Sequence, residues 1–409
     1  MEKTLFVGCD VSSTDFVVCF MNHQGDELGY KTYSNNLPGA REFEALLLKM
    51  MGQYSFISLK IATEATSFYD LHLVEFLSSS VSLEKFQTQI FQLNPKIVSN
   101  FKRAYIDKDK TDINDSFVIA DRLRFGRISE PYENNKPYLP LRRLTRYRFH
   151  LVETIAREKT YFFTHLYLKY SNFSLENPFT SVFGTTSLSI ITEFSPEELA
   201  QMTVEELMDF IVKKGRNHFS EPQKIVKAIK SMVSNSYRLK PGLSSSVDII
   251  LTTCLHTIKT LEHSLKDIDK AIEREFKAFP NTLQSIKGIG PVYSAALFSE
   301  IGDVNKYDNQ AALAKQAGLT WRKFQSGNFN AQETTMTKTG NKYLRYYLVQ
   351  AANMLRVHNK EYKDFYSKKF KEVNKHQHKR AIVLTARKFV RLLYALLKKG
   401  QLYLHNYQQ

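Results

Sequence analysis

The chain has 409 residues, of which 43% are hydrophobic and 13% aromatic, so it can form a packed core and two or three domains and is not a disordered chain. Its 57 Lys and Arg residues outnumber 41 Asp and Glu residues, and the net charge of +16 favours a polyanionic partner, most simply nucleic acid. No apolar run approaches the length that spans a bilayer, and no N-terminal signal segment is present. We therefore expect a cytoplasmic protein with no membrane partner.

The three cysteines, Cys9, Cys19 and Cys254, form neither a Cys-x-x-Cys pair nor a disulfide framework. This pattern indicates a reducing compartment and no zinc site.

The first part of the chain predicts strands in a meander, followed by strands that alternate with helices. Apolar runs bounded by turn residues indicate the strands, and amphipathic periodicity indicates the helices. This order predicts a mixed α/β sheet. The expected strands are 4–9, 15–21, 31–34, 56–62 and 88–93, and the expected helices are 41–51, 68–77 and one that begins near residue 96.

Four acids follow strands or open a helix in this part of the chain. Asp10 ends the first strand, and Glu64 follows the strand 56–62. In the stretch 110–121 (KTDINDSFVIAD), Asp112 and Asp115 are spaced to share one face of a helix that Thr111 caps. Because sites gather at the carboxyl ends of strands in open α/β sheets, all four acids can converge. Carboxylates held this close repel each other unless a cation such as Mg²⁺ lies between them.

Each acid also has a simpler interpretation on its own. Strand-end acids are common turn and cap residues, and acids in the first turn of a helix suit its dipole. Only the joint placement of the four acids favours a metal site.

Residues 138–170 predict a long amphipathic helix with a basic face, and 245–279 predict a second long helix with near-heptad apolar spacing. Between them, 197–212 predict a helix, with Thr203 and Glu206 spaced as a capping box. The two long helices suggest an antiparallel coiled coil or a dimer contact, and the sequence leaves this open. On the first helix we expect phosphate contacts from Arg142, Arg143 and Arg146, against the alternative of a solvated coiled-coil face.

The last part of the chain contains a glycine turn and a serine loop. Gly288-Ile289-Gly290-Pro291 precedes a helix and resembles a helix–hairpin–helix DNA-binding motif, although an ordinary turn between helices has the same pattern. Ser326 lies in a Gln-Ser-Gly loop between expected short strands, where a turn residue is the commonest interpretation. Basic residues follow, and we expect nucleic-acid contacts from Lys338, Lys342, Arg345, Arg387 and Lys388, the last two on a helix over 378–399.

Taken in order, these motifs resemble the DEDD insertion-sequence transposases, relatives of the pilin-gene invertase. The resemblance spans nearly the whole chain, and its specificity comes from the order and spacing of individually weak motifs. One position departs from the family, which usually has Gly after the Thr of the glutamate motif where this chain has Ser67. The motifs are the strand-end Asp10, Glu64-x-Thr66-x-x-Tyr69, Asn94-Pro95, Lys110-Thr111-Asp112-x-x-Asp115, Gly288-Ile289-Gly290, Gln325-Ser326-Gly327 and Lys338-x-Gly340-Asn341.

The resemblance implies an N-terminal ribonuclease-H-like, resolvase-like DEDD domain (1–130), a basic coiled-coil linker with a helical insert (131–280), and a C-terminal helical transposase domain (281–409). It implies Mg²⁺ or Mn²⁺ at Asp10, Glu64, Asp112 and Asp115, with Ser326 as a nucleophile that forms a phosphoserine link to DNA. It further implies donor and target DNA, a structured guide RNA encoded by the element, a homo-oligomer (dimer or tetramer), and a nucleoid-associated protein of a bacterium or archaeon.

Three hypotheses follow from the sequence. The first is a DNA transposase, or recombinase, that uses the four acids, Mg²⁺ and Ser326. The second is a metal-dependent, structure-specific nuclease, like a Holliday-junction resolvase, in which Ser326 is only structural. The third is a non-catalytic nucleic-acid scaffold that uses the basic helices and the glycine turn.

Overall fold

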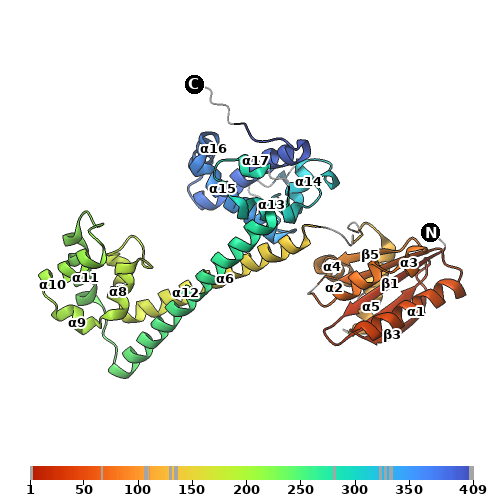
Figure 1. The fold of residues 1–409 in the computed structure, drawn as a ribbon, viewed down its shortest axis with the longest axis horizontal. Coiled ribbons are helices and arrows are strands. Elements are labelled where there is room, and N and C mark those ends of the chain that lie inside the picture. The colour runs from red at the N-terminus through yellow and green to blue at the C-terminus, as the bar shows by residue number, and fades with distance from the viewer. Residues whose placement is uncertain are drawn as a thin grey trace. The chain divides into compact units, whose positions relative to one another are not determined.

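The computed structural model separates the chain into two compact units, Met1–Pro137 and Tyr138–Gln409 (Figure 1). Each unit is described by itself. The division into three domains at residues 130 and 280 stays a prediction. The described residues are 3–65, 68–105, 109, 111–128, 131–132, 137–279, 282–321, 325–326, 329–330 and 335–404.

The first unit contains a five-stranded mixed sheet in the order β3-β2-β1-β4-β5. The β1–β2 and β2–β3 pairs are antiparallel, as expected for a meander, and β4 and β5 continue the sheet parallel to β1. Parallel neighbours need crossover connections, which the helices between them provide. The strands are β1 (Thr4–Val11), β2 (Asp15–Met21), β3 (Glu27–Ser34), β4 (Ser58–Glu64) and β5 (Gln89–Leu93).

Helices cover both faces of this sheet. Alternating strand residues such as Leu5 and Val7 form one core with α1 (Leu37–Gln53), α2 (Leu71–Ser78) and α3 (Val81–Glu84). Phe6 and its alternates form a second core on the other face, together with α4 (Pro95–Lys102) and α5 (Asp112–Phe125). This period-2 division of side chains confirms the α/β prediction, while the likeness to ribonuclease H stays a prediction.

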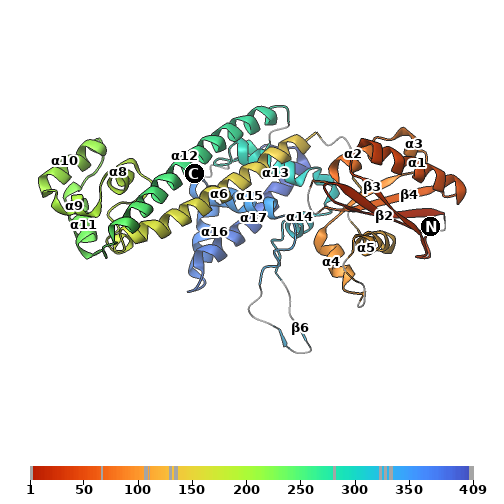
Figure 2. The same ribbon diagram turned by 90° about the horizontal axis from the view of Figure 1, so that it is seen from below.

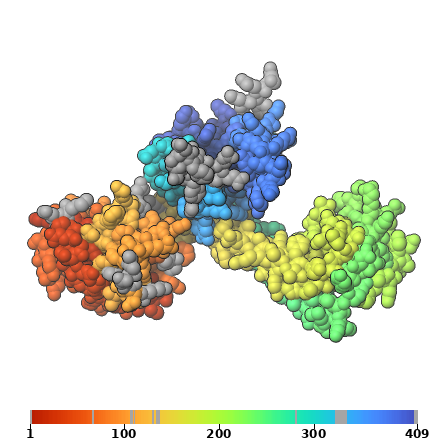
Figure 3. Space-filling view, turned by 180° about the vertical axis from the view of Figure 1, so that it is seen from behind, coloured from red at the N-terminus to blue at the C-terminus, as the bar shows by residue number. Residues whose placement is uncertain are grey.

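Two long helices run side by side through the second unit and form a stalk, which we define as α6 (Leu139–Lys169) with α12 (Pro241–Phe276) (Figures 1 and 2). The chain leaves and returns at one end of the stalk, so the pair is antiparallel within one chain. Five shorter helices pack around that end and share a core with it (Figure 3, green). They are α7 (Phe173–Glu176), α8 (Thr185–Glu193), α9 (Pro196–Gln201), α10 (Val204–Lys214) and α11 (Pro222–Asn235).

The single helix expected over 197–212 is wrong, because the chain forms α9 and α10 there, separated at Met202 and Thr203. Thr203 and Glu206 form the expected capping box, and Ser195 and Glu198 form another at the start of α9. A capping box marks the start of a new helix, so the Thr203 and Glu206 pattern also indicates that the preceding helix, α9, has ended.

The opposite end of the stalk carries a helical bundle with its own core. A two-stranded hairpin, β6 with β7, belongs to the same part of the chain. Among the helices that the structure describes, none has the length and apolarity to cross a membrane. The elements are η1 (Leu283–Ser285), α13 (Pro291–Ile301), η2 (Val304–Lys306), α14 (Gln310–Gln316), β6 (Gln325–Ser326), β7 (Phe329–Asn330), α15 (Lys342–His358), α16 (Lys360–Lys371) and α17 (Gln377–Lys399).

Candidate functional site

Asp10 and Glu64 lie at the same edge of the sheet in the first unit. Strands β1 and β4 are parallel, with Gly8 opposite Ala62 and Cys9 opposite Thr63, so Asp10 and Glu64 come next in this register. The carboxyl ends of parallel strands meet at one edge, where open α/β sheets place their sites. The backbone therefore brings together two acids that are 54 positions apart in the sequence.

Asp112 and Asp115 reach this edge on α5, which packs against β1, β2 and β4. Thr111 caps α5 as expected, because its side chain accepts a hydrogen bond from the Asn114 N–H. The close approach depends on Gly8, where a Cβ atom would lie 2.2 Å from the Ser116 carbonyl oxygen and 2.3 Å from the Ala120 nitrogen. Such distances are far inside van der Waals contact, so only glycine permits this packing.

The electrostatics show that the charges of neighbouring acids act on Asp10 and Glu64. Burial, followed by the charges of Asp115 and Asp112, raises the pKa of Asp10 to about 6. Burial, followed by the charges of Asp10 and Asp115, also raises the pKa of Glu64. Mutual repulsion and partial desolvation both disfavour the charged forms, as expected for carboxylates that share a site.

One lysine contributes the opposite charge. Lys102, the last residue of α4, pairs with Asp115 and lowers the pKa of both Asp10 and Glu64. Both partners in this ion pair are about three-quarters buried, with 28% and 24% of their side chains exposed. Sequence reasoning missed Lys102, because nothing in the basic segment 96–103 distinguishes the one lysine that the fold directs to the acids.

The donor set suits a hard divalent cation by charge and by atom type, because carboxylate oxygens are the ligands that Mg²⁺ and Mn²⁺ prefer. Within the described residues, no three Asp, Glu, His or Cys side chains already stand close enough together to hold a metal ion. Without a metal ion, the Lys102 ammonium supplies positive charge at the edge of the sheet where the acids lie. Thr66 and Ser67 of the glutamate motif lie outside the described residues.

A buried aspartate supports the strand that carries Glu64. Asp70 is 3% exposed and accepts hydrogen bonds from Thr63 Oγ1 at 2.7 Å and Gln92 Nε2 at 2.8 Å. These bonds tie the end of β4 to β5 directly beside Glu64. The sequence pattern contained no signal for this role, since Asp70 has the position of an ordinary helix cap.

Ser326 lies in the second unit, on strand β6, where it pairs with Phe329 of β7 (Figure 2). Short strands are present as expected, but Ser326 lies on one of them and not in a loop between them. Its side chain lies outside the described part of the structure. We define the arm as residues 322–334 and its root as residues 316–321 together with 335–341.

The described root is well connected. Thr337 N–H donates to the Thr320 carbonyl at 2.8 Å, and Trp321 bridges to Met336. Asn341 N–H donates to the Gln316 carbonyl at 2.7 Å, so the two ends of the root are joined. Gly340, at φ +124°, allows this closure, because a Cβ atom there would lie 2.4 Å from the Gln316 oxygen.

Most of the basic side chains expected to contact nucleic acid also have partners inside the second unit. Arg345 donates to the carbonyls of Ala317 and Lys338, which places it in the root of the arm. Arg142 and Arg146 bond to residues of α13. Arg387 donates to Gln310, and Lys388 pairs with Glu361. Their role in nucleic-acid binding stays a prediction, as does that of the exposed Arg143, Lys338 and Lys342.

The glycine turn has the backbone geometry expected of a tight turn. Gly288 has φ +94°, and Gly290 is the N-cap of α13. The element before the turn is the three-residue 3-10 helix η1 and not a full α-helix. A Cβ atom at Gly288 would lie 2.7 Å from the His358 ring, so packing also requires this glycine. The helix–hairpin–helix resemblance stays a prediction.

Comparisons with known proteins match both ends of the chain. A family model for DEDD transposases of the IS110 type, described as "Transposase", matches residues 7–170, which contain all four acids. A second model, described as "Transposase IS116/IS110/IS902 family", matches residues 281–367, which contain Ser326.

Two relatives add to these matches. The "Insertion element IS116 uncharacterized 44.8 kDa protein" of Streptomyces clavuligerus is 25% identical over 315 residues, which are 75% of this chain and 76% of the relative. The "Putative transposase y4rJ" of Sinorhizobium fredii is 40% identical over 73 residues, 18% of each chain. The two family models, which together match more than half of the chain, and the long alignment agree that this chain belongs to the IS116/IS110/IS902 family of insertion-sequence transposases.

Proposed function

We propose that this protein is the transposase of an insertion sequence, and that it cuts and rejoins DNA through a covalent serine–DNA intermediate. The observation that carries the proposal is the convergence of Asp10, Glu64, Asp112 and Asp115 at one edge of the sheet, with the pKa of Asp10 raised to about 6. Partly buried carboxylates that repel one another are typical of functional sites, because such an arrangement does not favour the stability of the fold.

In the proposed reaction, the Ser326 hydroxyl oxygen attacks a DNA phosphorus. A bond forms between Oγ and phosphorus, and the bond from phosphorus to a deoxyribose oxygen breaks. The serine proton leaves, and the released DNA oxygen takes up a proton. Attack of another DNA hydroxyl on the phosphoserine reverses these changes, so the phosphodiester is restored without an energy source, as rejoining requires.

The four carboxylates would hold Mg²⁺ or Mn²⁺, which when bound supplies stabilisation of negative charge on the transferring phosphate. Lys102 has a distinct part in this proposal. Its ammonium offsets the charge of the acids when no cation is bound, and it orients Asp115 through their ion pair. Backbone contacts from lysines and arginines would hold DNA without regard to sequence.

Sequence choice would come from base pairing with an element-encoded guide RNA, and the site would be completed in a dimer or tetramer that holds two DNA duplexes. Purification of the native chain from its host, followed by sequencing of the nucleic acid that it retains, tests the guide. One structured RNA species is the expected outcome, and recovery of only bulk cellular RNA would contradict it.

Covalent DNA attachment tests the central proposal. We expect Ser326→Ala to remove the protein–DNA adduct on a denaturing gel and to abolish recombination, at least a thousandfold, because no other group replaces the attacking oxygen. Thr335→Ala, at an exposed threonine in the root of the arm, is the matched control and should retain the adduct.

The runner-up is a metal-dependent, structure-specific nuclease that resembles a Holliday-junction resolvase. It predicts that Ser326→Ala still cleaves branched DNA while Asp112→Asn does not. If Asp112→Asn behaves like the control Asp109→Asn, an exposed carboxylate three residues earlier, both enzymatic proposals are wrong and a binding scaffold remains.

A further inference from the structure

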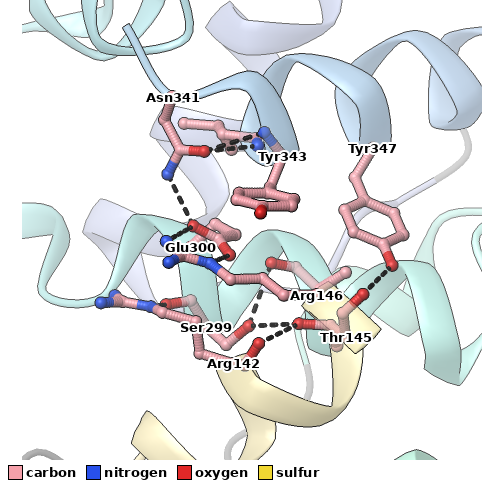
Figure 4. Close-up of polar contacts among 10 residues, drawn as sticks. Arg142, Thr145, Arg146, Ser299, Glu300, Asn341, Tyr343 and Tyr347 are labelled. Carbon is pink, nitrogen blue, oxygen red and sulfur yellow. Dashed lines mark hydrogen bonds and ion pairs between the residues drawn. The ribbon is translucent and has the colours of Figure 1, made fainter. Parts of the chain in front are cut away.

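A buried carboxylate, Glu300, lies where the stalk meets the root of the arm. It is at the end of α13, and none of its side chain is exposed to solvent. A carboxylate removed from water is costly unless charged and hydrogen-bonding partners surround it. Glu300 has such partners from two different directions (Figure 4).

The first partner comes from the stalk. Arg146 of α6 donates from Nε to Glu300 Oε1 at 2.7 Å and from Nη2 to Oε2 at 2.9 Å. This two-point pairing holds both planar groups in one orientation. The guanidinium also lies over the Tyr343 ring, 4.6 Å from its centroid, so it is held on a second side.

The second partner comes from the root of the arm. Asn341 Nδ2 donates to Glu300 Oε2 at 2.6 Å, while its Oδ1 accepts from the N–H groups of Tyr343 and Leu344 and caps α15. The cap fixes which end of the amide faces the helix, so the amino end must face Glu300. The Asn341 N–H also closes the root of the arm on Gln316.

We propose that Glu300 is a positioning residue that fixes the root of the arm relative to the stalk through its joint contacts with Arg146 and Asn341. The bond from Tyr347 Oη to the Thr145 carbonyl at 2.6 Å, by contrast, joins α15 to α6 and involves no residue of the root. Glu300 differs because it joins the stalk to the residue at which the arm returns to the bundle. The proposal rests on the proposed role of Ser326 for its effect on DNA and on the contacts alone for its effect on the arm.

Glu300→Gln is the informative variant because it keeps size and shape but removes the charge. A glutamine has one acceptor oxygen, so it cannot serve Arg146 at two points and also accept from Asn341. We expect the root of the arm to sample more orientations and the yield of the Ser326–DNA adduct to fall at least tenfold, with DNA affinity changed less than twofold.

Asp269→Asn is the matched control. Asp269 of α12 accepts two bonds from Arg148 of α6, an ion pair of the same two-point type in the same stalk, and within the described residues it has no bond to the root of the arm. The control tests whether loosening any stalk ion pair has the same effect.

The position of the root relative to the stalk can be measured without DNA. Spin labels at Thr335→Cys in the root and Ala156→Cys on α6 occupy exposed positions, and the natural cysteines are buried. We expect Glu300→Gln to broaden the distance distribution between the labels in pulsed electron paramagnetic resonance, and Asp269→Asn to leave it unchanged. Equal distributions for Glu300→Gln and the native chain, or equal broadening in both variants, would overturn the proposal.

Two further results distinguish the positioning role of Glu300 from the proposed serine chemistry. If Glu300→Gln does not fold, Asn341→Ser retains a helix cap but shortens the link to Glu300, and it should broaden the same distribution. If the distribution broadens but the native chain forms no adduct with DNA, the positioning role stands and the proposed serine chemistry fails.

Discussion

The acid site and the serine arm are built by different means. The acids of the first unit lie on elements that pack over much of their length, since β1 is flanked by β2 and β4 and covered by α5. In the second unit, a few hydrogen bonds and Gly340 close the root of the arm. Groups on elements that pack over their length are held more rigidly than groups held by a few local bonds, so the acids suit fixed geometry. For the root of the arm, we propose that local ties such as Glu300 supply that rigidity.

The largest expected effect is on the packing that holds the acid site in the first unit. In Gly8→Ala, the added Cβ meets backbone atoms of Ser116 and Ala120 at 2.2–2.3 Å, and backbone cannot yield without moving α5. We expect the first unit to lose about 3 kcal/mol or more of unfolding free energy, with faster hydrogen exchange in α5 peptides.

Gly52→Ala is the control for that change. Gly52 lies in α1, and a Cβ atom there meets nothing within 4 Å, so the substitution should stabilise the helix by roughly 0.5 kcal/mol. Similar destabilisation by both substitutions would show that the close approach of α5 to Gly8 is not decisive.

The next largest effect is expected from a substitution in the root of the arm, which should leave the acid site unchanged. Gly340 has φ +124°, and its Cβ would lie 2.4 Å from the Gln316 carbonyl oxygen, so Gly340→Ala should cost about 2 kcal/mol in the second unit. We expect the Ser326–DNA adduct to be lost while added Mg²⁺ still raises the melting temperature of the first unit.

Gly400→Ala provides the comparison at another positive φ. Gly400 has φ +61° and open space around it, so only the backbone cost of about 1 kcal/mol remains. An adduct yield that falls equally in both variants would indicate general destabilisation of the second unit and no special role for the root of the arm.

The smallest expected effect tests the repulsion among the acids, through the pH dependence of the stability of the first unit. Because the pKa of Asp10 is raised from 3.8 to about 6, the folded state binds this proton more tightly than the unfolded state. The contribution of Asp10 to stability therefore falls as the pH rises through the window from about 4 to about 6. At pH 7.5 with a chelator, Asp10→Asn should stabilise the first unit by about 1 kcal/mol, once solvent screening is counted.

Divalent cation supplies the contrast. Mg²⁺ or Mn²⁺ should stabilise the native first unit, because a bound cation relieves the repulsion, and should stabilise Asp10→Asn much less. Thermal unfolding with and without cation measures both effects, and Asp109→Asn should behave like the native chain. A variant that loses stability at pH 7.5 would mean that Asp10 has a favourable partner that outweighs the repulsion.

Local sequence patterns determined much of this protein. Apolar runs bounded by turn residues predicted the strands of the first unit, and Thr111 predicted the start of α5, because these signals depend only on neighbouring residues. The pairing of Asp10 with Glu64 followed from strand ends, since strand direction in an α/β sheet is restricted. The same local reasoning failed at Thr203, where a capping signal inside an expected helix marked a break.

Only the tertiary structure decided the partners. Lys102 and Glu300 carry no motif, yet Lys102 reaches the acids and Glu300 bonds to both the stalk and the root of the arm. Arg146 shows the reason most clearly, because helical periodicity places it on a basic face but cannot say which helix packs there. Charge and spacing are properties of the chain, whereas the neighbour that a side chain meets across 154 positions is set by packing.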